Sequence, residues 1–209
     1  MALVIGNGAY TAVPGLPNPA NDAADVAVVL ERLGFRVLKG IDLQRDAMVD
    51  LVEEFARAAS EAEVALAYYA GHGLQVRDVN YLIPVDGRVQ DEFGLRRLVR
   101  LDELIEDTGR ARKLALVVVD ACRDNPFVAG LQRSLGASRA AGVGGGLAAP
   151  AVATTQTLVA YATAAKAVAA DGAEGARNSP FTAALVKHLV EPEDIRIVFG
   201  RVRDSVVAA

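Results

Sequence analysis

Short, continuous apolar runs alternate along the chain with segments in which apolar residues recur every three or four positions. Such runs are typical of strands buried on both faces, and the second pattern is typical of amphipathic helices. We expect strands at 3–5, 35–38, 64–69, 114–119 and 157–162, a hairpin-like stretch at 74–85, and helices at 18–34, 48–59, 101–106, 179–189 and from about 194. This order predicts an α/β fold: a doubly wound, mostly parallel sheet with right-handed crossovers and helices on both faces.

The segment from Phe127 to Thr155 has a different character. It is rich in Gly, Ala and Ser, it contains three consecutive glycines at 144–146, and it carries Arg133 and Arg139. Loops of this length are usually functional or disordered, so the pattern predicts a long mobile loop. With 209 residues in total, the chain is long enough for one domain and short for two.

Composition narrows the classes of function. The chain is 52% hydrophobic and 23% charged, with a net charge of -4 and no basic stripe, which argues against a nucleic-acid surface. No apolar run reaches the roughly 18 residues of a membrane span. Cys122 is the only cysteine, so no intramolecular disulfide can form, and no Cys/His cluster has zinc-ligand spacing. We expect a cytoplasmic protein, with removal of a signal peptide as the alternative; the sequence does not determine the oligomeric state.

Two strand ends carry chemically distinctive residues. The run at 68–73 ends the third expected strand with His72 between two glycines, and the run at 119–124 ends the fourth with the lone Cys122, 50 residues later. Ligands of open α/β sheets gather beyond the carboxyl ends of the strands, and neighbouring parallel strands would bring these two residues together. An imidazole can take the proton of a thiol and return it to a leaving amine. The pair therefore predicts nucleophilic catalysis.

The glycine after the histidine fits the same chemistry. Gly73 has no side chain, so a backbone N–H there could approach a substrate carbonyl and form an oxyanion hole with the N–H of Cys122. The structural alternatives are a buried apolar cysteine and a simple Gly-His-Gly turn. The second histidine, His188, lies on the apolar face of its helix and is expected to be a packing residue.

Tyr-Ala-Gly-His-Gly at 69–73 and Asp-Ala-Cys-Arg at 120–123 resemble the metacaspase and bacterial orthocaspase branch of the caspase-like peptidases. Further segments look like landmarks of that family in the family's order: 2–7, 21–23, 81–86, 125–127 and 161–163. The resemblance implies a caspase-like fold with a large-subunit-like portion (1–127), a linker (128–154) and a small-subunit-like portion (155–209). It also implies that His72 and Cys122 hydrolyse peptide bonds.

The resemblance further implies cleavage after Arg or Lys in protein or peptide substrates. Asp22 and Asp120 are the matching acidic positions, and Tyr161 is a further candidate substrate contact. Two carboxylates would attract a guanidinium or ammonium group and repel an aspartate. For Asp22, the alternative is a first-turn carboxylate that stabilises the helix dipole. The residues at 164–166 depart from the family's Pro-Gly, which leaves the shape of the cleft there open.

The sequence has more than one interpretation for metal binding, for the role of the linker and for the class of function. Some metacaspases bind calcium, and Asp86, Asp102 and Glu103 fall near the matching positions; a further expected carboxylate is missing, so we expect no cofactor. Arg133 and Arg139 suggest self-cleavage within 128–154, with an ordinary solvated linker as the alternative. Two other classes remain: a non-catalytic caspase-like interaction module, and a nucleotide-binding domain, which the Gly6-Asn7-Gly8 turn supports only weakly.

Overall fold

A central parallel sheet organises the molecule. The computed structural model describes residues 1–122, 127, 131, 143–144, 147, 156–162 and 175–208. Within these residues the parallel strands lie in the order β2 (Val37–Ile41), β1 (Ala2–Gly6), β3 (Val64–Val76), β6 (Leu114–Cys122) and β8 (Thr157–Tyr161). Because β1 lies inside the sheet, the chain winds outwards in both directions from it. This confirms the predicted doubly wound α/β fold.

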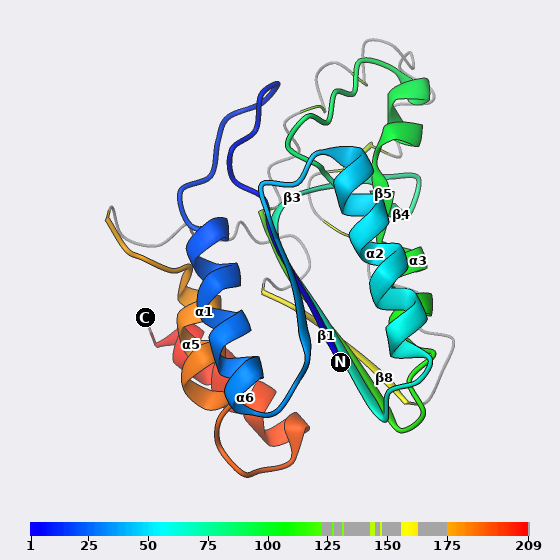
Figure 1. Ribbon diagram of the computed structural model, residues 1–209. Coiled ribbons are helices and arrows are strands. Elements are labelled where there is room, and N and C mark those ends of the chain that lie inside the picture. Colours follow the sequence, from blue (N-terminus) through cyan, green and yellow to red (C-terminus); the bar gives the residue numbers. More distant parts are fainter. Residues whose placement is uncertain are drawn as a thin grey trace.

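Helices cover both faces of the sheet (Figure 1). One face carries α1 (Pro19–Arg32), α5 (Pro180–His188) and α6 (Ile195–Val207), and the other carries α2 (Arg45–Ala59) and α3 (Leu101–Thr108). Strand side chains alternate between the two cores: Leu3 and Ile5 pack with the α2 and α3 side, whereas Ala2 and Val4 pack with the α1 side. None of the described helices is both long and apolar enough to cross a membrane.

Strand β3 is longer than the sequence predicts. It runs through His72 to Val76, because beyond its parallel partner β6 it gains two antiparallel partners, β4 (Val79–Leu82) and β7 (Val143–Gly144). The short strand β5 (Val99–Arg100) pairs with β4, and the 3-10 helix η1 (Glu92–Arg97) precedes it. The predicted end of the third strand at Tyr69 is therefore wrong, because the glycines that look like a turn lie inside an extended strand.

The described residues of the expected loop 127–155 are packed. Phe127 and Leu131 are buried in a third apolar cluster with Leu74, Val76 and Ile83. Leu147 is also buried, and the strand β7 pairs with the end of β3. At these points the segment packs against the rest of the fold, whereas its composition predicts a long mobile loop.

Candidate functional site

His72 and Cys122 occupy paired positions on neighbouring strands. They are the last register pair of the parallel ladder between β3 and β6, at the carboxyl end of β6 and at the point where β3 leaves its parallel partner. Two positions paired in this way have neighbouring backbones although 50 residues separate them in the sequence. The fold thus brings the two backbones together at the sheet edge where open α/β sheets bind ligands.

The imidazole of His72 is held in one orientation. It is 5% exposed, and its Nε2 lies 2.9 Å from the carbonyl oxygen of Pro14. A carbonyl oxygen only accepts hydrogen bonds, so Nε2 carries the hydrogen and Nδ1 is the basic nitrogen of the neutral ring. The ring of Tyr10 packs against the imidazole with the two ring centroids 4.5 Å apart. Residue 14 therefore sets the tautomer of His72 through its backbone.

Two tyrosines fix the backbone of His72. Its N–H donates to the hydroxyl of Tyr10 at 2.7 Å, and its carbonyl accepts from the hydroxyl of Tyr69 at 2.8 Å and from the N–H of Ile83 at 3.2 Å. All four of these residues are buried. Buried polar groups are costly to leave unpaired, so these bonds hold His72 at one place in the strand.

The glycines on either side of His72 serve close packing. Gly71 has a φ of +153°, and a Cβ there would lie 2.6 Å from the hydroxyl oxygen of Tyr10 and 2.7 Å from that of Tyr69. A Cβ on Gly73 would lie 3.1 Å from a methyl carbon of Leu147 and 3.3 Å from the Cβ of Ala121. Gly71 thus leaves room for the tyrosine hydroxyls that hold His72. The predicted oxyanion role of Gly73 stays a prediction.

The loop that supplies the Pro14 carbonyl is itself anchored. The side chain of Asn7 donates to the carbonyl of Ile83 and accepts from the N–H of Leu43, and Asp42 accepts from the N–H groups of Gly8 and Ala9 at 2.7 and 2.8 Å. Those two N–H groups are the ones a phosphate-binding turn would use. Here they bind a carboxylate of the same chain, which argues against the nucleotide-binding alternative.

Asp22 and Asp120 come together on the α1 and α5 side of the sheet. Asp22 is 2% exposed in the first turn of α1, and Asp120 is 8% exposed near the end of β6. Ser179, the N-cap residue of α5, contacts both carboxylates: its N–H donates to Asp22 at 3.0 Å and its hydroxyl donates to Asp120. The two acidic residues that the sequence singles out therefore share one neighbour.

A chain of hydroxyl groups leads to Asp120. The hydroxyl of Thr182 donates to the same carboxylate oxygen of Asp120 at 2.8 Å. Its own oxygen lies 2.6 Å from the hydroxyl of Tyr68, and because the hydrogen of Thr182 points to Asp120, Tyr68 is the donor of that contact. Burial, followed by the charges of Asp120 and Asp22, raises the pKa of Tyr68 well above its ordinary value, so Tyr68 keeps its proton.

The pKa of Asp22 is raised to about 7. Desolvation by burial is the main cause and the negative charge of Asp120 adds to it, while a hydrogen bond from Asn178 opposes the shift. Among the described residues, Asp22 makes no ion pair. With no cation from the described residues beside it, this buried carboxyl next to a second carboxylate is costly to ionise.

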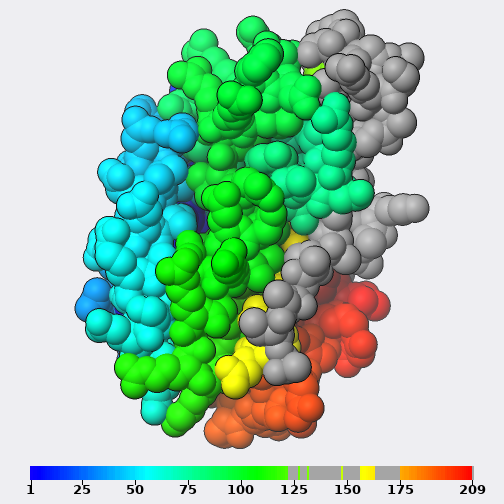
Figure 2. All heavy atoms as spheres, turned by 90° about the vertical axis from the view of Figure 1, so that its right-hand side faces the viewer, coloured from blue at the N-terminus to red at the C-terminus, as the bar shows by residue number. Residues whose placement is uncertain are grey.

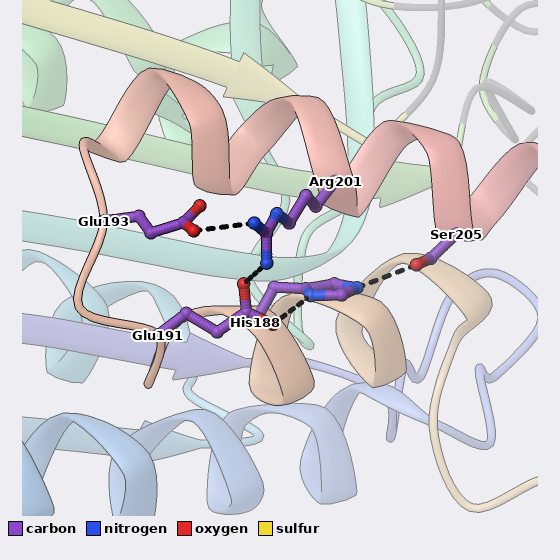
Figure 3. A network of polar contacts seen from close by, with 5 residues as sticks. All are labelled: His188, Glu191, Glu193, Arg201 and Ser205. Carbon is purple, nitrogen blue, oxygen red and sulfur yellow. Dashed lines mark hydrogen bonds and ion pairs between the residues drawn. The ribbon is translucent and has the colours of Figure 1, made fainter.

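The remaining residues singled out from the sequence lie elsewhere or outside the described residues. Tyr161 ends β8, in register with Val119, and is partly buried. His188 is buried between α5 and α6 and contacts Glu191 and Ser205 (Figure 3), which confirms it as a packing residue. Arg133, Arg139 and the segment 164–166 lie outside the described residues.

The carboxylates near the expected calcium positions are engaged with arginines. Asp86 accepts from the backbone N–H of Arg45 at 2.9 Å, and Arg100 forms ion pairs with Asp102 and Glu103. Within the part of the chain that the structure describes, no group of three or more His, Cys, Asp or Glu side chains is arranged to hold a metal ion. Asp86, Asp102 and Glu103 thus each have a partner within the protein.

A separate cavity of about 720 Å³ lies on the far side of the sheet. It is bordered by Arg45 on α2, Arg100 on β5 and Asp107 on α3, and also by Tyr81. Figure 2 faces this side, with α2 in cyan and α3 in green. The cavity contains neither His72 nor the acidic pair, so it is distinct from the site at the strand ends.

Sequence reasoning missed the residues that support the site. Pro14 acts through its carbonyl, and a backbone contact leaves no residue-type signature. Ser179 was recognisable as a helix cap from the Ser-Pro pair, but its contacts to Asp22 and Asp120 depend on how α5 packs over α1 and β6. From the sequence, Tyr68 was recognisable only as part of an apolar strand and Thr182 only as part of a helix.

Comparison with known proteins places this geometry in a family. The whole chain, residues 1–209, matches the family described as Caspase domain (Peptidase_C14). Mucosa-associated lymphoid tissue lymphoma translocation protein 1 from Homo sapiens and its homolog from Mus musculus are each 30% identical over 127 residues, which is 59% of this chain and 15% of each of those proteins. Protein GSU0716 from Geobacter sulfurreducens has a similar fold, with a TM-score of 0.66 and 20% identity, covering 97% of this chain and 87% of that chain. The chain spans only a small part of its curated relatives, and by the match over its full length it belongs to the caspase domain family of peptidases.

Proposed function

We propose that this protein is a cysteine endopeptidase of the metacaspase and orthocaspase branch that cleaves after Arg or Lys. The observation that carries the proposal is the register pairing of His72 with Cys122, where the parallel ladder between β3 and β6 ends. Membership of the caspase domain family supports a cysteine-peptidase type of chemistry and protein substrates.

In the proposed reaction, His72 takes the thiol proton of Cys122 and the thiolate attacks the carbonyl carbon of the scissile bond. Collapse of the tetrahedral intermediate breaks the C–N bond, and the imidazolium returns its proton to the leaving amine. Water then hydrolyses the acyl-enzyme with His72 as the base. The bond from Nε2 to the Pro14 carbonyl supports this role, because it leaves Nδ1 as the proton acceptor and stabilises the imidazolium. The N–H groups of Gly73 and Cys122 are proposed to bind the oxyanion.

The acidic pair is the proposed specificity element. Asp22 and Asp120 are buried together and share Ser179, so a side chain that reaches them would have to bring a positive charge. A substrate aspartate at the same place would add a third carboxylate to a desolvated site, which is strongly unfavourable. Tyr161 is proposed as a further substrate contact at the end of β8.

We propose that the reaction needs no calcium. The ion pairs from Arg100 to Asp102 and Glu103 support this, because a guanidinium of the protein itself already lies beside these carboxylates. A cytoplasmic location is proposed on the lone cysteine and the absence of disulfide pairs, which suit a reducing compartment.

The test is a matched series of fluorogenic peptides that end in Arg, Lys, Gln or Asp, assayed with calcium and with a chelator. We expect cleavage after Arg and Lys, little after Gln, none after Asp, and equal rates in both buffers. Cys122→Ala and His72→Ala should each lose at least about a thousandfold in kcat/KM.

Two results would contradict the proposal. One is cleavage that survives in Cys122→Ala. The other is a folded wild-type protein that neither cleaves the peptides nor reacts with a thiol-directed probe ending in Arg, which would support the non-catalytic interaction module instead.

A further inference from the structure

The N-terminus of α5 contacts both Asp22 and Asp120 through Ser179 and Thr182. We propose that Ser179 and Thr182 are positioning residues, which hold this acidic pair in the geometry and charge state that bind a cationic side chain. This role rests on the proposed specificity for basic residues and identifies the groups that build it. Neither hydroxyl is placed among the reacting groups.

Ser179 uses each of its polar groups on the site or on its own helix. Its N–H donates to Asp22, its hydroxyl hydrogen goes to Asp120, and its hydroxyl oxygen accepts from the N–H of Thr182 at 3.0 Å. The last bond is an ordinary helix cap, but the other two are not needed for capping. One residue therefore links α1, β6 and the start of α5.

Thr182 adds a second donor to the same oxygen of Asp120. The hydroxyls of Ser179 and Thr182 thus both donate to this buried carboxylate, and the hydroxyl of Tyr68 donates in turn to that of Thr182. Hydrogen bonds to the charged form of a carboxyl favour that form, and cooperative chains strengthen them. The hydroxyls thus favour the charged form of Asp120.

Asp22 differs from Asp120 in its surroundings. Facing it are Asp25 on α1, Asp120 on β6, Tyr68 on β3, and Arg177 and Asn178 before α5. Arg177 is committed to Asp25, with its Nε and Nη2 bonded to both carboxylate oxygens at 2.9 and 2.8 Å, so it does not neutralise Asp22. The pKa of Asp22, raised to about 7 mainly by burial, leaves it partly protonated at neutral pH.

A cation bound at the acidic pair would favour the ionised form of Asp22. Below pH 7, cation binding should therefore release a proton from Asp22, and the affinity for the cation should increase as the pH rises through 7. Without the hydroxyl of Ser179, Asp120 would lose a donor to its charged form, and its proton affinity would rise. A variant that lacks this hydroxyl should therefore bind cations more weakly at neutral pH and recover at alkaline pH, when both carboxylates are ionised.

The experiment measures the binding of agmatine, a small probe with a guanidinium at one end of an aliphatic chain and an ammonium at the other, by calorimetry at pH 6, 7 and 9 on the whole protein. Ser179→Gly is the informative variant, because glycine keeps the N–H to Asp22 and caps a helix almost as well. We expect agmatine to bind about tenfold more weakly than to wild type at pH 7, with the difference closing to within about twofold at pH 9. Thr182→Val should behave in the same way, whereas Thr182→Ser, which keeps the hydroxyl, should bind agmatine as the wild type does.

A merely structural role predicts another result. Ser179→Gly would then weaken binding by the same factor at every pH, or leave it unchanged, and either outcome overturns the inference. Failure of the proposed peptidase is separable: a protein that binds agmatine with this pH profile but cleaves no peptide keeps the positioning role and loses the reaction. Where cleavage occurs, Ser179→Gly should raise KM for Arg substrates and leave kcat nearly unchanged.

Discussion

Asp22 is a residue whose proposed function conflicts with the stability of the fold. Its folded pKa of about 7 lies above the ordinary 3.8, so the folded state holds a proton that the unfolded chain releases. Between these two values the free energy of unfolding falls as the pH rises, and above pH 7 the loss is complete.

We therefore expect Asp22→Asn to be more stable than wild type at high pH and less active on Arg substrates. Asparagine keeps an oxygen that can accept from the N–H of Ser179 but never ionises. The difference in Tm should open as the pH rises from about 4 to about 7 and stay constant above that. Thermal unfolding at pH 5 and pH 8 measures it, with the exposed Asp46→Asn as the control. A gap that is equal at both pH values would show that ionisation of Asp22 is not its cause.

Gly71 is the second single residue on which the site depends. We expect Gly71→Ala to lower the free energy of unfolding by at least about 2 kcal/mol, because alanine at a φ of +153° is strained and its Cβ would meet two tyrosine hydroxyls. Denaturant unfolding gives the magnitude. The matched control is Gly200→Ala in α6, where a Cβ has open space around it and should stabilise the helix by about 0.5–1 kcal/mol. If Gly71→Ala is as stable as wild type, the close packing around His72 is not essential.

The sequence could predict the reactive residues better than their supports. His72 and Cys122 are rare residue types placed after apolar runs, so their position at strand ends was visible, and their register pairing agrees with that expectation. The carbonyl of Pro14 and the hydroxyl of Ser179 act on residues far away in the sequence. Such contacts are fixed by tertiary packing, and neither residue type nor spacing indicates them.

Helices α5 and α6 are joined by a polar network at the end of α5 remote from the acidic pair (Figure 3). His188 bonds to Glu191 and to Ser205, and Arg201 forms ion pairs with Glu191 and Glu193. The hydrogen bond from His188 is the main reason why the pKa of Glu191 is lowered. A lowered carboxyl pKa stabilises the fold above the ordinary value and loses that contribution as the pH falls through the folded value.

We expect Glu191→Gln to lower Tm at pH 6 and to make less difference at a strongly acidic pH below the lowered folded pKa of Glu191, where the contribution of the charged side chain is lost from the wild type as well. Thermal unfolding at the two pH values measures this. Glu54→Gln, on the exposed face of α2, is the control and should have no effect at either pH. Equal losses of Tm at both pH values would contradict a charge-dependent contact between α5 and α6.

At the level of elements, the hydrophobic pattern predicted the helices and a mostly parallel sheet but not where the strands end. The central strands are uniformly apolar because both faces are covered, and that signal is strong. The hairpin-like stretch predicted at 74–85 is confirmed by the antiparallel pairing of β3 with β4, but the unbroken course of β3 through Gly71 and Gly73 was not predicted, since glycines usually indicate a turn. Its antiparallel partners are the short strand β4 and the two-residue strand β7, which is distant in the sequence. Pairing with these strands outweighs the preference of the glycines for a turn.

The two halves of the chain are interlocked across the whole molecule. Strand β8 pairs with β6 through five register positions, and α5 packs beside α1 and against α6. Phe127 and Leu131 are buried in the cluster beside β3. The residues after the linker thus complete a sheet and a core that the residues before it begin, so a break within 128–154 should not separate them.

Self-cleavage within 128–154 should leave the two parts of the chain associated. If the proposed peptidase cuts after Arg133 or Arg139, purified wild type should give two fragments on a denaturing gel but elute as one species at the intact position in native gel filtration, because β6–β8 pairing and helix packing hold the pieces together. Cys122→Ala and the double variant Arg133→Ala/Arg139→Ala should remain uncut, whereas Arg88→Ala, outside the segment, should be cut like wild type. Fragments with the same boundaries in the double variant, or fragments that separate without denaturant, would refute this account: the first because the cut does not follow the arginines, the second because the shared sheet does not hold the cut chain.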